Sequence, residues 1–341
     1  MQGLSSKGFF LLTTHCSLLT AHSFPALIIN MEDNVPPRLG LKIDVDTWQG
    51  FREGVPALAE ILEARGVKAS FYVSLGPDNS GKAVFRVFRQ QGFLEKMWRT
   101  RAPAMYGLRT MFYGTLLPAP VIGAGAGEIL RELAAQGHEV GLHGYDHVRW
   151  HDHLLAMGRE EVSRELARAQ EFYLRYLGQQ ARSFAAPGWQ CSAAHRAELA
   201  AGGFLYSSDT RGYAPYFPRF GAEVNTLLEI PTTLPTQDEL LGFNGCNSED
   251  FTELVLSRLH KSSVPQVLTV HAEVEGGPLK EDFARLLDRC REQGVALFRL
   301  EDWARELLAG QDRIPAASVR QGRLPGRAGT VSCQGPPEAQ R

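Results

Sequence analysis

Two spacing patterns of apolar residues alternate along residues 39–298. Short runs in which every residue or every second residue is apolar are typical of strands, and a 3.6-residue period is typical of helices. The predicted strands cover residues 39–46, 67–73, 140–142, 182–186, 204–208, 228–231, 266–270 and 295–298. The predicted helices cover residues 55–64, 128–136, 160–176, 193–201 and 281–293. This alternation is the sequence signature of an α/β protein built as a β/α barrel.

Polar side chains with catalytic potential gather where these strands end. Barrels carry their chemistry at the carboxyl ends of their strands, because the loops that follow all open on the same face. Four such residues lie at predicted strand ends and a fifth follows one, namely Asp44, Asp46, Asp209, His271 and His143. We therefore predict one active-site ring rather than five unrelated surface residues.

The first strand places two carboxylates side by side. Its alternating pattern puts Lys42, Asp44 and Asp46 on one face, because successive side chains point to opposite sides of a strand. Two like charges this close raise the pKa of one carboxyl unless a cation lies nearby. The pair calls for a metal ion, a lysine or a shared proton, and a solvent-facing edge strand is the alternative.

Five of the ten histidines lie between His138 and His153. His143 and His147 are four residues apart, so on a helix both imidazoles project from one face and can bind one metal ion. Gly144 stands where the H-E-x-x-H pattern requires its glutamate, which excludes that class of metalloprotease. A surface helix that carries two histidines by chance remains the alternative.

Composition narrows the range of possible binding partners and the cellular compartment. The formal charge of −2 and the pI of about 6.6 give no global attraction to nucleic acid or to an anionic membrane. The five cysteines form no C-x-x-C pair, so we interpret them as reduced thiols of a cytosolic protein.

Three segments fall outside the barrel pattern. Residues 1–37 are a poorly patterned extension, and we favour Met31 over Met1 as the initiator. Residues 311–341 are rich in Gly, Pro, Arg, Gln and Ser, which predicts a flexible tail. An insertion at about residues 78–120 is basic and apolar, with seven lysines and arginines against one acid within residues 82–117. A lid on the barrel is one interpretation of this insertion, but we favour a membrane-interface helix.

The motifs as a set resemble the polysaccharide deacetylase family, the NodB-homology amidohydrolases. The resemblance covers residues 39–310 and rests on Asp44-Val45-Asp46, His143-x-x-x-His147, Ala186-Pro187-Gly188-Trp189, Asp209 and Val270-His271. It implies a single-domain distorted (β/α) barrel with seven or eight strands over residues 38–310. It also implies one divalent metal ion, zinc, manganese or cobalt, held by Asp46, His143 and His147.

The same resemblance implies the catalytic roles. Asp44 matches the family's base and His271 its acid, with Asp209 expected to keep His271 charged. Pro187, Gly188 and Trp189 match the substrate loop, in which backbone N–H groups at Gly188 and Trp189 support the oxyanion. Glu273 and Glu275 are further substrate-contact candidates, if the strand continues past His271. Ala185 replaces the family arginine that supports the base, and our hypothesis is that Arg211 orients Asp44 instead.

Further stretches resemble one branch of this family. They are Arg52-Glu53-Gly54-Val55-Pro56, Gly76-Pro77-Asp78-Asn79, Ser207 to Gly212, Leu234-Pro235-Thr236 and His271 to Gly276. That branch removes a formyl group from formamido-L-arabinose on undecaprenyl phosphate at the cytoplasmic face of the bacterial inner membrane. The reaction serves aminoarabinose modification of lipid A and resistance to cationic peptides. The alternatives are an N-deacetylase of chitin-like or peptidoglycan sugars and a catalytically silent sugar-binding barrel.

Overall fold

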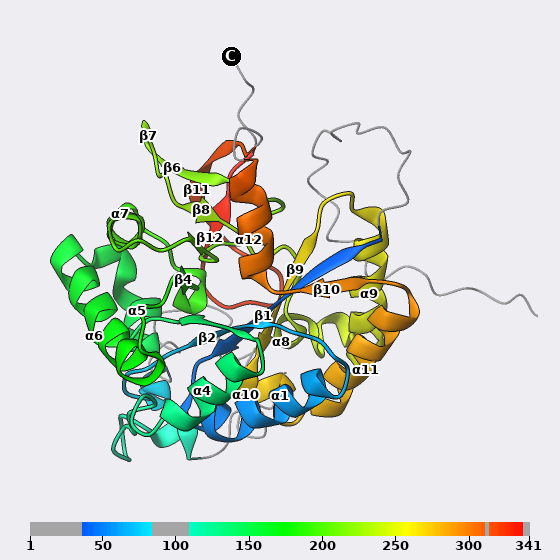
Figure 1. The fold of residues 1–341 in the computed structure, drawn as a ribbon, viewed down its shortest axis with the longest axis horizontal. Coiled ribbons are helices and arrows are strands. Elements are labelled where there is room, and N and C mark those ends of the chain that lie inside the picture. The colour runs from blue at the N-terminus through cyan, green and yellow to red at the C-terminus, as the bar shows by residue number, and fades with distance from the viewer. Residues whose placement is uncertain (1–35, 84–108, 311–313, 337–341) are drawn as a thin grey trace, which may run out of the picture.

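The computed structural model describes residues 36–83, 109–310 and 314–336 (Figure 1). Almost all of the N-terminal extension and the central part of the basic insertion, residues 84–108, lie outside the described residues. The predictions made for those two segments are therefore not addressed by the fold.

Eight parallel strands form the central sheet of the described chain. In chain order they are β1 (Arg38–Val45), β2 (Ser70–Val73), β3 (Glu139–Leu142), β4 (Ser183–Phe184), β5 (Tyr206–Ser207), β8 (Leu228–Glu229), β9 (Gln266–His271) and β10 (Ala296–Phe298). Neighbours run β10-β1-β2-β3-β4-β5-β8, and β9 pairs with the other side of β1. Every one of these pairs is parallel, which agrees with strands that are connected through helices.

The two edges of the sheet meet, so the sheet closes into a distorted barrel. After β8, the N–H groups of Thr233 and Leu234 donate to the carbonyl of Val267 on β9 at 3.2 and 3.1 Å. The hydroxyls of Thr232 and Thr269 add a contact of 2.8 Å across the same seam. The predicted distorted (β/α) barrel with seven or eight strands is confirmed.

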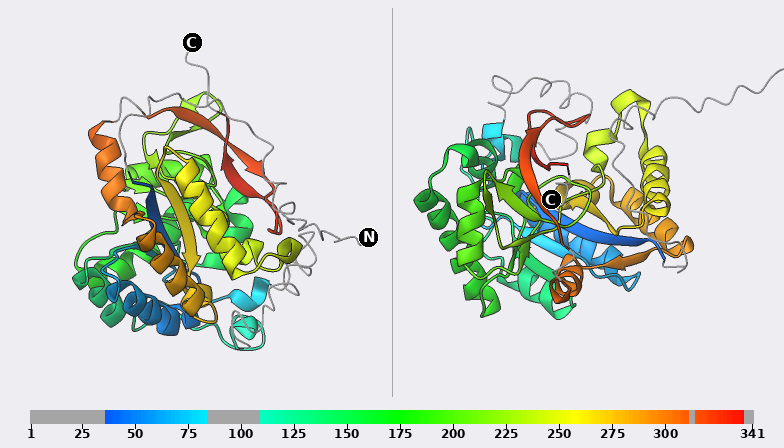
Figure 2. Two further views of the ribbon diagram at one scale, coloured as in Figure 1. Left: turned by 90° about the vertical axis from the view of Figure 1, so that its right-hand side faces the viewer. Right: turned by 90° about the horizontal axis from the view of Figure 1, so that it is seen from above.

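Amphipathic helices cover the outside of this sheet (Figures 1 and 2). They are α1 (Val55–Glu63), α4 (Gly127–Ala135), α6 (Arg159–Leu177), α7 (Ala193–Ala201), α9 (Ser248–Lys261), α11 (Lys280–Glu292) and α12 (Leu300–Ala309). Their ends follow capping rules. Asn247 accepts hydrogen bonds from the first turn of α9, and α6 stops at Gly178, whose φ of 70° is favourable for glycine. The apolar faces of these helices pack on the sheet and form the main core.

The C-terminal segment is not a flexible tail, so that prediction is wrong for residues 314–336. There β11 (Ala316–Gly322) pairs in parallel with β6 (Phe217–Phe220), and β12 (Val331–Gln334) pairs antiparallel with β11. With β7 (Glu223–Val224) they form a second sheet of four strands, seen in red and yellow-green in Figure 2. The segment lacks apolar periodicity because it buries only a few side chains, such as Ala317 and Val331, and is held by backbone pairing.

Candidate active site

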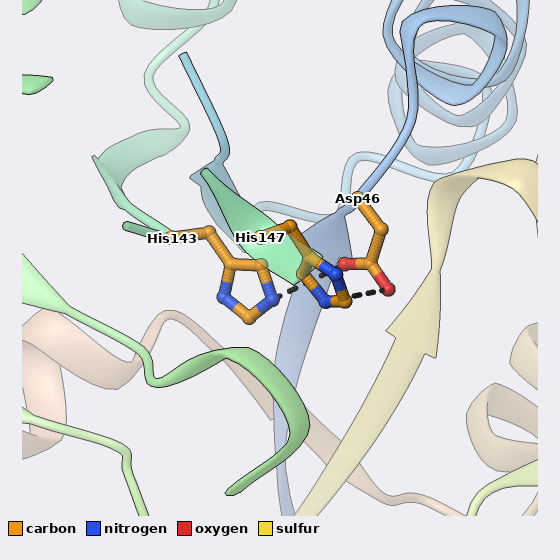
Figure 3. Close-up of side chains that lie close together, drawn as sticks. All are labelled: Asp46, His143 and His147. Atoms are coloured by element: carbon orange, nitrogen blue, oxygen red, sulfur yellow. Dashed lines mark ion pairs between the residues drawn. The ribbon is translucent and has the colours of Figure 1, made fainter. Parts of the chain in front are cut away.

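Asp46, His143 and His147 meet at the carboxyl ends of β1 and β3 (Figure 3). Asp46 follows β1, His143 follows β3, and His147 begins the short helix α5 (His147–His153). The Nε2 atom of His143 lies 3.1 Å from Asp46 Oδ1, and the Nε2 atom of His147 lies 3.2 Å from Asp46 Oδ2. Asp146 caps α5 by accepting from the N–H of Arg149 at 3.0 Å, which fixes the turn between the two imidazoles.

This group has the chemistry of a metal site. Its ligand atoms all lie within 4.8 Å of one another, and Asp46 Oδ1 is buried without a hydrogen-bond partner among the described residues. His143 Nδ1 lies 2.8 Å from the carbonyl oxygen of Ala185, so Nδ1 carries the proton and Nε2 is left with a lone pair toward Asp46. Burial alone would raise the pKa of Asp46, but His147 and His143 lower it well below its usual value. One carboxylate and two such imidazoles fit a divalent ion.

Asp44 lies beside this group and is oriented by a lysine. Its Oδ2 is 3.3 Å from Lys42 Nζ, and both side chains are buried. Lys42 Nζ also donates to the carbonyl of Ser208 at 3.0 Å, which fixes the ammonium group. Asp44 Oδ1 has no hydrogen-bond partner among the described residues and lies 3.9 Å from His143 Nδ1. Of the options left open by the sequence, the structure places the lysine at Asp44 and the candidate metal site at Asp46.

The hypothesis that Arg211 orients Asp44 is wrong. Its guanidinium pairs with Glu239 at 2.7 Å and donates to the carbonyl of Leu234 at 2.9 Å. Lys42 was already visible on the same strand face as Asp44, so the sequence did contain the correct signal.

His271 ends β9 directly opposite Asp44 on β1. Its ring meets Trp189 edge to face, with centroids 6.2 Å apart, and its Nδ1 lies 3.9 Å from Asp238 Oδ1. The carboxylate beside His271 is therefore Asp238, and the prediction that Asp209 holds His271 is wrong. Asp238 lies on α8 (Gln237–Leu240), a short helix that the strand pattern did not reveal.

Asp209 belongs to a sealed cluster between the sheet and helix α7. Its Oδ2 accepts from Arg196 Nη1 at 3.1 Å and from the hydroxyl of Ser207 at 2.7 Å, and Arg196 also pairs with Glu229 at 2.9 Å. Burial and the charge of Asp209 raise the pKa of Glu229 to about 7, against the opposing effect of Arg196. Asp209 also groups with Cys191 and His195 as possible ligands. We assign no metal there, because Asp209 Oδ2 already accepts from Arg196 and Ser207.

The loop after β4 holds Trp189 against His271. Gly188 and Trp189 have φ values of 62° and 53°, and a Cβ at Gly188 would lie 1.9 Å from the ring of His151. The Trp189 N–H donates to the carbonyl of Ala186 at 3.1 Å and closes the turn that begins at Pro187. The predicted oxyanion donor at Trp189 is therefore occupied, which leaves the N–H of Gly188 as the candidate.

The strand does not continue past His271, so the predicted shared face with Glu273 and Glu275 is wrong. Helix α10 (Ala272–Glu275) begins at once, and both carboxyl groups are buried. Glu275 Oε2 accepts from the N–H of His271 at 2.8 Å, and Glu273 packs on Gly50, where a Cβ would lie 2.4 Å from Oε2. Glu275 thus supports the backbone of the acid, and Glu273 packs on the segment that follows β1.

Comparisons with known proteins identify relatives of this chain. The family model described as polysaccharide deacetylase matches residues 36–206. A protein of Shewanella sediminis, named "Probable 4-deoxy-4-formamido-L-arabinose-phosphoundecaprenol deformylase", is 33% identical over 87% of this chain and 94% of its own length. A protein of the same name from Wigglesworthia glossinidia brevipalpis is 29% identical over 84% of this chain and 98% of its own.

A solved structure shares the fold. The crystal structure of a probable polysaccharide deacetylase from Pseudomonas aeruginosa PAO1 covers 84% of this chain and 98% of its own, with a TM-score of 0.55 and 18% identity.

Proposed function

Because this chain belongs to the polysaccharide deacetylase family, we propose that it is an amide hydrolase that deformylates 4-deoxy-4-formamido-L-arabinose-phosphoundecaprenol. The observation that carries the proposal is the convergence of Asp44, Asp46, His143, His147 and His271 at adjoining strand ends. The substrate comes from the names of two relatives that match most of the chain.

The chain's own residues provide each group that the reaction needs. When bound by Asp46, His143 and His147, a divalent ion supplies Lewis acidity to the formyl oxygen and to the attacking water. The donor set suits zinc, manganese and cobalt alike. Asp44 takes a proton from that water through Oδ1, while Lys42 holds Oδ2.

His271 acts on the nitrogen side of the amide bond. Its imidazolium donates a proton to the sugar nitrogen as the C–N bond breaks, which yields formate and a free amino sugar. Asp238, Trp189 and the backbone contact from Glu275 fix its ring and its place at the end of β9. The backbone N–H of Gly188, next to Trp189, is our candidate donor to the oxyanion.

Formate release from the purified lipid-linked formamido sugar tests this function. We expect turnover that a chelator abolishes and that added divalent metal restores. Acetate release from N-acetylated chitin-like or peptidoglycan oligosaccharides, without formate release from the lipid-linked sugar, would instead identify an N-deacetylase. Turnover of neither substrate by metal-loaded protein would identify a silent sugar-binding barrel.

The proposed substrate is a lipid, so we also propose that the enzyme meets it at the surface of the inner membrane, from the cytoplasmic side. The described residues include no helix that is both long and apolar enough to span a bilayer. The basic apolar segment at residues 82–117 is our candidate for the membrane contact. Unchanged pelleting with membranes after deletion of residues 84–117 would remove that candidate.

A further inference from the structure

Trp189 contacts both the lysine that holds the base and the acid itself. The centre of its ring lies 5.4 Å from Nζ of Lys42 and 6.2 Å from the ring centre of His271. We propose that Trp189 is a positioning residue shared by the base and the acid, and that the hydroxyl of Thr232 fixes its ring. This inference rests on the proposed function and adds two residues to its machinery.

The base and the acid stand on adjacent strands. In the register of β1 with β9, Lys42 lies beside Thr269 and Asp44 lies beside His271. Side chains two residues apart on a strand share a face of the sheet, and so do register partners on neighbouring strands. These four side chains therefore form one patch, in which Lys42 Nζ and Asp44 Oδ2 are 3.3 Å apart.

Trp189 approaches this patch from a distant part of the sheet. It ends the turn Pro187–Trp189 after β4, and the neighbours of β4 in the sheet are β3 and β5. Trp189 is 2% exposed, and the Cζ atoms of Arg211 and Arg327 also lie 4.9 and 4.5 Å from its ring centre. An indole enclosed in this way has little surface for a substrate. Its surroundings favour a role in holding its neighbours in place.

The hydroxyl of Thr232 sets the orientation of this ring. Trp189 Nε1 donates to Thr232 Oγ1 at 3.0 Å, and Thr232 Oγ1 lies 2.8 Å from Thr269 Oγ1. The backbone of Thr232 is itself fixed, because its N–H donates to the carbonyl of Thr210 and its carbonyl accepts from the N–H of Gly212, both at 3.0 Å. An indole has one hydrogen-bond donor, so this bond selects one orientation of the ring.

The ring acts on the base and on the acid through different contacts. A cation is attracted to an aromatic face, so Trp189 helps to hold the ammonium group of Lys42 at Asp44. The ring of Tyr72 lies 6.0 Å from the same Nζ and adds a second aromatic contact. His271 meets Trp189 edge to face, which restricts rotation of the imidazole. A shift of the indole would therefore misplace both partners and lower kcat rather than substrate binding.

The variants Thr232→Val and Thr232→Ser test this role. Valine has the shape of threonine but cannot accept the indole N–H, whereas serine keeps the hydroxyl. We expect Thr232→Val to lower kcat for formate release about 10-fold with KM unchanged, because the buried indole N–H loses its acceptor. Thr232→Ser should retain most of the wild-type rate.

The matched control is Thr252→Val, which removes a buried hydroxyl that donates to the carbonyl of Ser248 at 3.0 Å within α9. It should lower the stability and leave kcat and KM unchanged. Wild-type kcat in Thr232→Val would overturn the proposal, and so would an equal loss in Thr232→Val and Thr232→Ser, which would assign the loss to packing. A raised KM with unchanged kcat would place Trp189 on the substrate instead.

A measurement by NMR spectroscopy without substrate separates this inference from the proposed function. The indole N–H signal of Trp189, identified by its absence in Trp189→Phe, should exchange with deuterium about 10-fold faster in Thr232→Val than in the wild-type protein. The ring signals of His271, identified with His271→Gln, should move in Thr232→Val and stay in place in Thr252→Val. These results can hold in a protein that releases no formate, in which case the function fails and the positioning contacts survive. Equal exchange rates, or unmoved His271 signals, overturn the proposal.

Discussion

Asp44 and Glu229 are both buried carboxylates beside a cationic side chain, yet their oxygens are used differently. Glu229 accepts from the N–H groups of Asp209 and Thr210, from the hydroxyl of Thr210 and from Arg196. Asp44 contacts Lys42 through one oxygen, and its other oxygen has no hydrogen-bond partner among the described residues. A carboxylate saturated by internal donors is a structural element, whereas one with an open oxygen beside other reactive groups can do chemistry.

The largest expected effect is at the candidate active site, at Asp44. Asp44→Asn should lower kcat about 10²- to 10⁴-fold while the protein keeps its metal, because only the proton acceptor is lost. Asp46→Asn is the paired variant and should lose the metal as well. Formate release and metal content by mass spectrometry, measured on both proteins, check the difference. Metal loss in Asp44→Asn would place Asp44 among the ligands and merge the two roles.

Substitutions in the sealed cluster of Arg196, Asp209 and Glu229 should lower the stability of the fold. Arg196→Met leaves Asp209 and Glu229 buried without their cation and should destabilise the fold by about 3–5 kcal/mol, measured by urea unfolding. Arg159→Met is the matched control, since it breaks an arginine pair with Glu198 at the surface and should cost about 1 kcal/mol or less. A stable Arg196→Met protein with lost activity would mean that the cluster is catalytic after all.

Lys42 connects the two regions, because it holds Asp44 and also donates to Ser208 next to Asp209. Lys42→Met should lower kcat roughly 10- to 100-fold, since a charge-assisted contact that positions the base is removed. The pH profile of kcat should change along with it, and Lys42→Arg should restore part of the rate. A stability loss with an unchanged pH profile would assign Lys42 to the sealed cluster only.

The smallest effect concerns the pH dependence of stability. Burial raises the pKa of Glu275 to about 8 from 4.5, so the folded protein binds a proton there that the unfolded chain releases. Its contribution is complete below pH 4.5 and is lost as the pH rises toward 8, by about 1.4 kcal/mol per pH unit at most.

Glu275→Gln should therefore flatten the fall in unfolding free energy across that pH window. The oxygen of glutamine can still accept from the N–H of His271. Glu160→Gln, at a highly exposed carboxylate, should leave the slope as it is. An unchanged slope in Glu275→Gln would mean that another buried acid, such as Glu229, dominates the window.

The sequence could predict those features that depend on local periodicity. Alternation along β1 placed Lys42, Asp44 and Asp46 on one face. The prediction that His143 and His147 share one helix face is wrong, because a loop between β3 and α5 brings the two imidazoles together. The sequence could not predict which partner a side chain contacts on a distant element of the fold. Arg196 lies on a helix and reaches Asp209 through the interior, so its contact with Asp209 follows from packing and leaves no trace in the spacing.

The C-terminal sheet shows the same limit. Pairing of β11 with β6 joins residues about a hundred positions apart, and only backbone geometry records it. Few of its side chains are apolar and buried, so its composition resembles that of a mobile segment.

The late position of β11 and β12 in the sequence has a consequence for protein synthesis. A ribosome that stopped after residue 310 would release a chain with every candidate metal ligand, the base and the acid, but without β11 and β12. Such a product would lack the contacts that Ser332 makes with Cys191 and Arg211. The sheet that β11 and β12 complete can therefore form only after all the barrel strands have left the ribosome.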